Sequence, residues 1–368
     1  MKTLSWNCQG LGNPWTVQDL YQLEKEKKPN LVFLMETKMN SKKAEKVKRS
    51  LKGDGFFVAE PVGKKGGLIM WWDQNVTAEV ANYSHRHISL WIYDEKGQDK
   101  WLLTGYYGEP DGRKRSDSWK FFTLLKPERN IGWGVIGDFN ELVSQDEKVG
   151  GRQRLENQMK DFREALEDGG LYDMGWRGDK FTWSNKHADE TFTKERLDRV
   201  VVNAKWKSSF RESWVEVLAA RCSDHRPLLW CMYQTRNNGI RRRKVFRYEA
   251  SWALEEECNE VLKRVWDQVG ETNLLSKLES SEVTLLKWNR IKILDSKKEI
   301  QDRTDELRLL QMNESRGNIS EIKSLQKELE KLLEQKDMKW RQRAKQNWFQ
   351  LGDRNTRFFH SCATQRQK

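Results

Sequence analysis

The chain has 368 residues, 37% of them hydrophobic and 33% charged, which is enough apolar material for one full-sized core and a further element. Its formal net charge of +12 at pH 7 favours a polyanionic partner such as nucleic acid, although a basic protein without such a partner can have the same composition. No apolar run approaches the roughly 20 residues of a membrane span, and the first residues contain no signal-peptide core, so we expect a soluble protein.

The first part of the chain alternates short β-type runs with Gly-rich turns and helical segments. The β-type runs are TLSWN at 3–7, LVFLM at 31–35, GGLIMWW at 66–72, HISLWIY at 87–93, WLLTGYY at 101–107, GVIG at 134–137, RLDRVVV at 196–202 and PLLWCMY at 227–233. Helical patterns rich in Lys and Glu lie at 16–28, 41–52 and 155–168. Strands mixed with helices predict one α/β domain over residues 1–236. The runs between 55 and 107 leave no room for helices, so the sheet should be mixed and contain antiparallel hairpins.

A change of composition at about residue 236 marks a second region. The basic patch IRRRKVFRYEASW at 240–252 leads into long helical patterns, and NESRGN at 313–318 separates two apolar stripes. We interpret residues 237–282 as a basic linker and helix, and residues 283–368 as a helical hairpin or coiled-coil connector. A dimerisation zipper is the alternative interpretation of the stripes.

Polar side chains recur where the predicted strands begin or end. They are Asn7, Glu36, Tyr107, Asp138, Asn140, Asp198, Asp224 and His225. Taken singly, each is more typical of a turn, a solvated helix start or a surface ion pair. Loops at the strand ends of α/β sheets converge on one crevice, however, so the recurrence predicts a single site.

The oxygen-rich part of this set suits a divalent cation. Glu36 and Asp224 offer carboxylates, and Asn7 or Gln9 offers a carbonyl, which are the ligands that Mg²⁺ prefers. The five cysteines are scattered and form no C-x-x-C pair, which argues against a zinc site or a disulfide framework and favours a reducing compartment.

The remaining residues suit hydrolysis of a phosphate ester. Asp138 and Asn140 are two positions apart, where strand geometry directs both to one side, and together they can hold and deprotonate a water molecule. His225, oriented by Asp198, can donate to a phosphoryl oxygen as negative charge develops. The sequence contains neither the G-x-S-x-G elbow of serine hydrolases nor a P-loop.

Six segments in chain order resemble the endonuclease/exonuclease/phosphatase superfamily, and most of all the apurinic-type endonuclease domain of plant LINE-type (non-LTR) retrotransposons. They are SWNCQGLG, LMETK, GYYGEP, IGDFNE, FTWSN…RLDRVVVN and SDHRPL. Each segment is a weak motif, but the ordered set is specific and spans residues 1 to about 235. The resemblance implies a four-layer α/β sandwich, in which helices flank two mixed β-sheets.

The resemblance also implies residue roles and a cofactor. It places Asn7, Glu36 and Asp224 at a metal, Tyr107 at the phosphate, Asp138 and Asn140 at the nucleophilic water, and Asp198 behind His225. Mg²⁺ is the expected cofactor, with Mn²⁺ as an alternative, and a nuclear location is expected. Gln9 stands where some relatives carry Asp, which leaves the strength of metal binding open.

Two segments of the second region resemble the connector between endonuclease and reverse transcriptase in such elements. They are FRYEASW at 246–252 and RQRAKQNWFQLGDRNTRFFHSCATQR at 341–366. No polymerase motif with paired aspartates follows before Lys368, so we expect a copy that keeps only the nuclease and the connector. A solvated basic helix without a role of its own is the alternative.

The sequence therefore predicts a metal-dependent endonuclease that hydrolyses DNA phosphodiester bonds, of the type that nicks retrotransposon target sites. The basic tail would add sequence-independent affinity for the phosphates of duplex DNA, or of RNA. Trp183 would either stack on bases or lie in the core. The alternatives are a non-catalytic nucleic-acid-binding remnant, a small-molecule phosphatase of the same superfamily, and a helical interaction module.

Overall fold

The structure is a computed structural model that describes residues 1–48, 54–61, 66–93, 100–128, 130–232, 256–268 and 274–344. The chain divides into two compact units. The first contains Met1–Arg236 and Leu307–Gln326, and the second contains Asn237–Glu306 and Lys327–Lys368. The basic patch at 240–252 and most of the tail at 341–366 lie outside the described residues.

The first unit contains two six-stranded mixed sheets. One has the order β14-β15-β1-β2-β4-β3 and is built from β1 (Lys2–Asn7), β2 (Leu31–Met35), β3 (Gly55–Ala59), β4 (Leu68–Trp72), β14 (Trp214–Val217) and β15 (Leu228–Cys231). The other has the order β10-β13-β8-β7-β6-β5 and is built from β5 (Ala78–Tyr83), β6 (His87–Tyr93), β7 (Lys100–Tyr107), β8 (Gly132–Asp138), β10 (Leu171–Asp173) and β13 (Asp198–Asn203).

Each sheet contains one parallel pair, and a helix connects the two strands of that pair. Helix α1 (Pro14–Lys27) connects β1 to β2, and α3 (Arg115–Thr123) lies between β7 and β8 in the chain. The predicted hairpins are present, because β3 pairs with β4, and β5, β6 and β7 pair in succession, all antiparallel. The remaining described elements within residues 1–236 are α2 (Ser41–Lys48), α4 (Glu156–Gly169), α5 (Ala204–Ser209), two 3₁₀ turns at 112–114 and 145–147, and a small sheet of β9 (Lys148–Gly150), β11 (Trp183–Ser184) and β12 (Thr193–Glu195).

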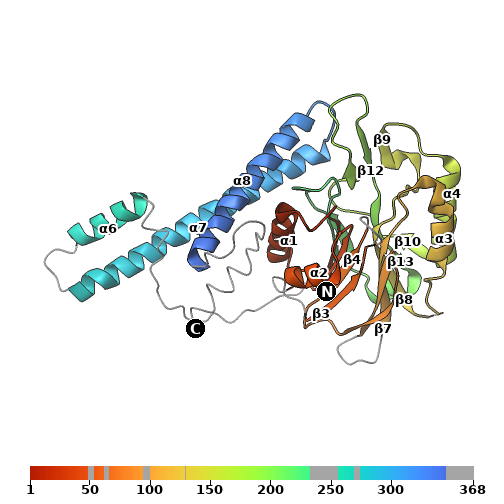
Figure 1. The fold of residues 1–368 in the computed structure, drawn as a ribbon, viewed down its shortest axis with the longest axis horizontal. Helices are drawn as coiled ribbons and strands as arrows, with labels where there is room; N and C mark the ends of the chain where they lie inside the picture. Colours follow the sequence, from red (N-terminus) through yellow and green to blue (C-terminus); the bar gives the residue numbers. More distant parts are fainter. Residues whose placement is uncertain are drawn as a thin grey trace. The chain divides into compact units, whose positions relative to one another are not determined.

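Because successive side chains of a strand point to opposite faces of its sheet, the hydrophobic residues form three clusters, one between the sheets and one on the outer face of each. In β2, Phe33 faces the core between the sheets while Val32 and Leu34 face the cluster that contains residues of α1. In β8, Ile136 faces the inter-sheet core and Val135 faces the cluster that contains residues of α3 and α4. Figure 1 shows α1 and α2 on the outer side of one sheet and α3 and α4 on the outer side of the other. The predicted four-layer α/β sandwich is confirmed.

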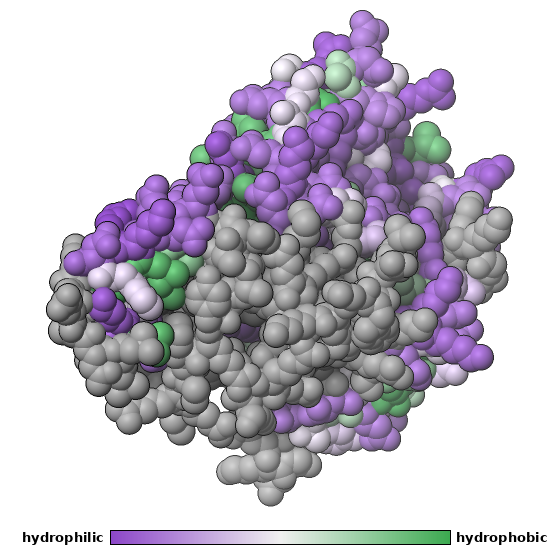
Figure 2. All heavy atoms as spheres, turned by 60° about the vertical axis from the view of Figure 1, so that its left-hand side comes forward, coloured by the Kyte–Doolittle hydropathy of each residue, from purple (hydrophilic) through white to green (hydrophobic). Residues whose placement is uncertain are grey.

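The C-terminal region is helical where it is described. It contains α6 (Glu256–Gln268), α7 (Leu274–Met312) and α8 (Ile319–Ala344), and the predicted turn at 313–318 joins α7 to α8. Among the described residues, no helix is both long and apolar enough to cross a membrane. The described surface visible in Figure 2 is largely hydrophilic, with hydrophobic residues in small separate patches, as the charged composition leads one to expect.

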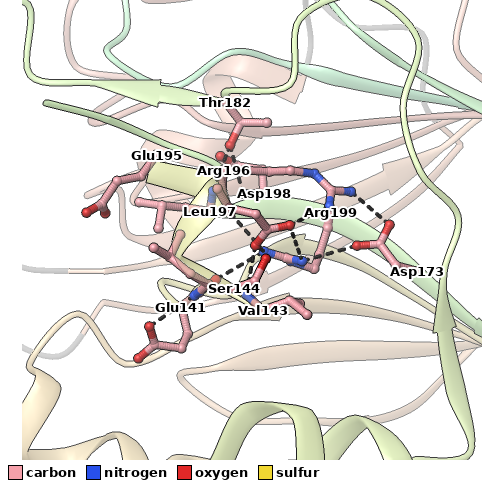
Figure 3. Close-up of polar contacts among 12 residues, drawn as sticks. Glu141, Val143, Ser144, Asp173, Thr182, Glu195, Arg196, Leu197, Asp198 and Arg199 are labelled. Carbon is pink, nitrogen blue, oxygen red and sulfur yellow. Dashed lines mark hydrogen bonds and ion pairs between the residues drawn. The ribbon is translucent and has the colours of Figure 1, made fainter. Parts of the chain in front are cut away.

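A buried ion-pair network lies next to the start of β13. Arg196 and Arg199 both contact Glu147 and Asp173, at distances between 2.7 and 3.1 Å. Figure 3 shows the two guanidinium groups converging on Asp173. In the chain, Arg196 precedes Asp198 and Arg199 follows it. Burial alone would raise the pKa of Glu147, but the charge of Arg199, followed by that of Arg196, outweighs burial and holds this pKa below its usual value.

This network makes folding stability depend on pH. Because the pKa of Glu147 is lower in the folded state than in the unfolded chain, its ionised form stabilises the fold above about pH 4.3, and this contribution is lost as the pH falls through the folded value. We expect the melting temperature of the parent protein to fall between about pH 5 and pH 3. In Glu147→Gln, stability should be about 3 kcal/mol lower at neutral pH and less dependent on pH in that range.

The measurement is thermal unfolding by circular dichroism as a function of pH. Glu164→Gln is the control, since Glu164 lies on the exposed face of α4. An equal acid dependence in the parent and in Glu147→Gln would contradict the assignment of the network.

Candidate active site

Asp138 lies at the C-terminal end of strand β8, which is flanked by two partner strands. Asp138 is the last residue of β8; Tyr107 of β7 is its parallel partner, and Asp198 of β13 is its antiparallel partner. The preceding Gly137 has φ +153°, and a Cβ there would lie 1.9 Å from the carbonyl oxygen of Tyr106. Only glycine therefore allows β8 to lie this close to β7 and to end with Asp138 in place.

His225 lies between the two facing carboxylates. Its Nδ1 is 2.9 Å from Asp198 Oδ2, and its Nε2 is 3.7 Å from Asp138 Oδ2. All three side chains are at least 95% buried. Burial alone would lower the pKa of His225, but the charges of Asp198 and Asp138 outweigh it and raise this pKa above its usual value. Burial raises the pKa of Asp138 and outweighs the opposing charge of His225, and the nearby charge of Asp198 raises this pKa further, so the cluster is arranged to hold a proton.

The backbone of His225 is fixed from two sides. Its amide N–H donates to Ser223 Oγ, and its carbonyl oxygen accepts from the Trp6 indole N–H at 3.2 Å. Asp198 is held in a comparable way, because its amide and that of Leu197 both donate to Thr182 Oγ1. The imidazole and its carboxylate partner therefore have little freedom to rotate away from each other.

Asn7 and Glu36 extend the cluster from the other sheet. The Asn7 side-chain N–H₂ donates to Asp138 Oδ2 at 3.0 Å and to Glu36 Oε1 at 3.3 Å. Because both partners are carboxylates, the nitrogen of the amide must face them, and this orientation fixes Oδ1 on the opposite side. Among the described residues, that buried Oδ1 has no hydrogen-bond partner. Glu36 also accepts from the Tyr107 hydroxyl at 2.7 Å.

Asp224 lies in a separate set of hydrogen bonds at the edge of the site. Its Oδ2 accepts from the Gln9 side-chain amide at 2.8 Å and from the Trp183 indole N–H at 2.9 Å. Trp183 is half-buried, so the structure gives it a polar contact in addition to partial packing in the core. Ser223 connects Asp224 to the first strand, since its hydroxyl donates to the carbonyl oxygen of Asn7 at 2.9 Å.

Three residues at the site have left-handed backbone conformations. Gln9, Glu36 and Asn140 have φ values of 52°, 52° and 56°, and each directly follows or closely follows the end of β1, β2 or β8. Asn140 is held there by its amide, which donates to Asp138 Oδ1 at 2.9 Å, and by its side chain, which donates to the carbonyl oxygen of Gly108. Such strained positions persist only where surrounding contacts enforce them, and they concentrate at functional sites.

Two groups of atoms could hold a cation. Oxygen or nitrogen atoms of Asp138, Asp198 and His225 lie within 4.8 Å of one another, but His225 is hydrogen-bonded to Asp198, and Asp138 already accepts from Asn7 and from the Asn140 amide. The second group contains Glu36 and Asn7, whose side chains offer the oxygen atoms that Mg²⁺ prefers. Because the Asn7 nitrogen faces Glu36 here, the unpartnered Oδ1 would face Glu36 only after the amide turned over to bind a cation. The unsatisfied oxygen decides between them, because a buried acceptor without a partner is unfavourable unless a ligand or water fills the place. The donors of the second group therefore fit a hard divalent cation.

The structure brings most of the residues predicted from the sequence together, and it adds others. Asn7, Glu36, Tyr107, Asp138, Asp198 and His225 form one hydrogen-bonded cluster, and Asn140 joins it through its backbone. Asp224 instead contacts Gln9 and Trp183. Sequence reasoning missed Thr182 and Ser223, whose hydroxyls hold the backbone of Asp198 and His225; a small hydroxyl residue beside a candidate site residue was the only available signal.

Two packed sheets that present carboxylates, an amide and a buried histidine at adjoining strand ends are suited to the hydrolysis of phosphate esters. A family model described as the Endonuclease/Exonuclease/phosphatase family matches residues 4–225, and the chain belongs to this family. The members of this family are nucleases or phosphatases, so the predicted superfamily is confirmed. No curated protein matches the sequence.

Solved structures with a similar fold have low sequence identity. The endonuclease domain of TRAS1, a telomere-specific non-LTR retrotransposon, is 15% identical, with a TM-score of 0.47, and the match covers 64% of this chain and 99% of that one. A 3'-5' exonuclease from Neisseria meningitidis is 16% identical, with a TM-score of 0.48 and coverages of 63% and 99%. An AP endonuclease from Leishmania major is 16% identical, with a TM-score of 0.48 and coverages of 63% and 87%.

The close approach at Gly137 leads to a test of how Asp138 is placed. Gly137→Ala should lower the free energy of unfolding by at least about 2 kcal/mol, because the new Cβ would overlap the backbone of Tyr106. Gly12→Ala is the control, since a Cβ at Gly12 meets no described atom within 4 Å. The measurement is urea denaturation of both variants and the parent. Equal midpoints for Gly137→Ala and the parent would show that β7 and β8 are not held this closely.

Proposed function

We propose that the chain is a metal-dependent endonuclease that hydrolyses phosphodiester bonds of DNA, of the type that nicks the target site of a LINE-type retrotransposon. The observation that carries this proposal is the buried group of Asp138, His225 and Asp198 directly beside Asn7 and Glu36. Family membership limits the chemistry to nucleases and phosphatases, and the net charge of +12 favours a polyanionic substrate over a small phosphoester.

In this proposal, the carboxylates and the imidazole divide the proton chemistry between them. Asp138 orients the attacking water and accepts its proton, which the raised pKa of this carboxyl favours. Asn140 limits where that water can lie, because its backbone is fixed to Asp138. His225 donates a hydrogen bond to a phosphoryl oxygen as charge develops in the transition state, and Asp198 keeps its ring in orientation.

Asn7 and Glu36 would hold the cation, and Asp224 would complete the site through its links to Gln9 and Ser223. A bound Mg²⁺ or Mn²⁺ would supply charge that stabilises the negatively charged phosphate in the transition state. The Tyr107 hydroxyl donates to one carboxylate oxygen of Glu36. Tyr107 would therefore orient Glu36 in addition to contacting the phosphate. The basic segments of the C-terminal region would add affinity for the DNA backbone.

The proposed activity is tested by nicking of supercoiled plasmid with Mg²⁺. Asp138→Asn, Glu36→Gln and His225→Ala should each reduce the rate by about 100- to 1000-fold, because each removes a group that acts on the transition state. Glu45→Gln, on the exposed side of α2, is the matched control and should cleave at the parent rate.

Three results would contradict the proposal. Nicking by His225→Ala at the rate of the parent would contradict the role assigned to His225. A parent protein that binds DNA but does not nick it would favour a non-catalytic binding protein. Hydrolysis of small phosphomonoesters without nicking would favour the phosphatase alternative.

The cation site is tested separately by calorimetry, which measures the affinity of chelator-treated protein for Mn²⁺. Glu36→Gln should weaken binding by about tenfold or more, since it removes the charged oxygen ligand, while Asp198→Asn should change binding by less than about twofold. Nicking by the treated parent should return with Mg²⁺ or Mn²⁺ but not with zinc alone, which prefers thiolate and imidazole ligands. The reverse pattern among the two variants would place the cation at Asp138, Asp198 and His225 instead.

A further inference from the structure

The turn between α7 and α8 packs against the loop that carries His225. Glu314 in this turn is 95% buried, and its Oε2 is 2.8 Å from the guanidinium of Arg226, the residue after His225. The other carboxylate oxygen, Oε1, accepts from the Ser184 hydroxyl at 2.5 Å. Arg226 also donates to the carbonyl oxygen of Gln311, at the end of α7. These contacts all lie within the first compact unit, which contains Leu307–Gln326.

Gln311 fixes the same turn to a second point of the unit. Its side-chain oxygen accepts from the amide of Ala220 at 3.1 Å, and its side-chain nitrogen donates to the carbonyl oxygen of Ala220 at 2.9 Å. Gln326 donates to that carbonyl oxygen as well, at 2.7 Å. Ala220 precedes the segment of Ser223, Asp224 and His225, so the turn and the helix ends that flank it contact this loop before and after the site residues.

Ser184 and Arg226 belong to two short segments that pair with each other at the active site. The Arg226 amide donates to the carbonyl oxygen of Thr182 at 2.7 Å, and the Ser184 amide donates to that of Asp224 at 3.2 Å. Between these bonds, Trp183 and His225 form an antiparallel bridge. Thr182 accepts from the Asp198 amide and Trp183 donates to Asp224, so this paired strip holds three site residues.

The charges around Glu314 balance only when the turn is in place. Arg226 and Lys194 are buried cations; Arg226 pairs with Asp179 and Glu314, and the Lys194 ammonium donates to the carbonyl oxygen of Glu314 at 2.9 Å. Removing the carboxylate of Glu314 would leave two buried cations facing one carboxylate. A buried charge without its partner is strongly destabilising locally, so the strip would be expected to move or to admit water.

We propose that Glu314 is a positioning residue of the active site, and that the hairpin turn at 313–318 holds the strip of 182–184 and 224–226 in its working geometry through Arg226 and Ser184. The effect on catalysis rests on the proposed nuclease function, whereas the effect on the strip does not. By this mechanism, the helical region bears directly on the rate of the site in addition to any affinity for nucleic acid.

The test compares Glu314→Gln with Glu321→Gln in the full chain. Both substitutions remove one carboxylate from the same hairpin, but Glu321 is exposed at the start of α8. Hydrogen exchange by mass spectrometry reports on the strip without need of activity. In Glu314→Gln, peptides that cover 180–186 and 222–228 should exchange about tenfold faster than in the parent, while β2 and β7 exchange at the parent rate.

Plasmid nicking gives the second readout. Glu314→Gln should lower kcat by about tenfold and change KM by less than about twofold, because displaced catalytic groups slow the chemical step while DNA contacts are retained. Glu321→Gln should match the parent in both assays. Ser184→Ala, which removes the hydroxyl donor to Glu314 and the acceptor of the Lys186 amide, should change exchange and kcat in the same direction by roughly threefold.

The outcomes separate this inference from the proposed function. An inactive parent would overturn the nuclease function, and the exchange data would still decide whether Glu314 holds the strip. An active parent with unchanged exchange and kcat in Glu314→Gln would overturn the inference alone. Faster exchange throughout the unit would also overturn it, since the role would then be global stability. If Glu314→Gln does not fold, a folded Ser184→Ala with parent exchange and kcat would have the same meaning.

Discussion

The candidate active site depends on two carboxylates held directly opposite each other on neighbouring strands. Asp138 and Asp198 are partners in the antiparallel register of β8 and β13, and like charges at such positions repel. The arrangement is favourable only because His225 lies between them, with a pKa that both carboxylates raise. The histidine comes from a distant loop, so the final geometry of the site requires both sheets to be assembled. Local strand pairing alone would create a repulsive pair.

The surrounding structure compensates for this concentration of buried charge. Arg199 belongs to β13, which lies between β10 and β8 in the sheet. Its guanidinium lies 5.2 Å from the centre of the Phe162 ring and pairs with Glu147 and Asp173. Its position next to Asp198 in sequence places it on the opposite face of β13. Charges are thus balanced separately on each face of the sheet, by ion pairs behind it and by the imidazole in front. Buried pairs of this kind add little net stability, but loss of one partner is strongly unfavourable. A different register of β13 would separate these pairs and is therefore disfavoured.

Residues with strong local signals were predictable from the sequence, and contacts between distant segments were not. The strands that contain LVFLM, WLLTGYY and GVIG, and the site residues at their ends, followed from apolar runs that stop at a polar group. Helix α3 was missed because its residues, RSDSWKFFT, include polar ones that obscure the apolar face made by Trp119 and Phe122. Asp224 was expected beside Glu36, but its bonds to Gln9 and Trp183 depend on the loop conformation, which no period in the sequence encodes. Glu314 gave no signal, since it is an acidic residue in a polar turn and its partner Arg226 is far away in the chain.

The contacts of the hairpin turn extend beyond the segment that the family model matches. A match to the family model ends at residue 225, immediately before Arg226, so the guanidinium that contacts Glu314 lies just beyond the matched segment. In a unit without this turn, Arg226 and Lys194 would need another anion or exposure to water. The turn supplies this anion from a segment that follows in the chain after a long intervening region. The order of the loop that carries His225 is therefore expected to depend on the turn at 313–318, a segment far along the chain, through the contacts of Glu314 with Arg226 and Ser184.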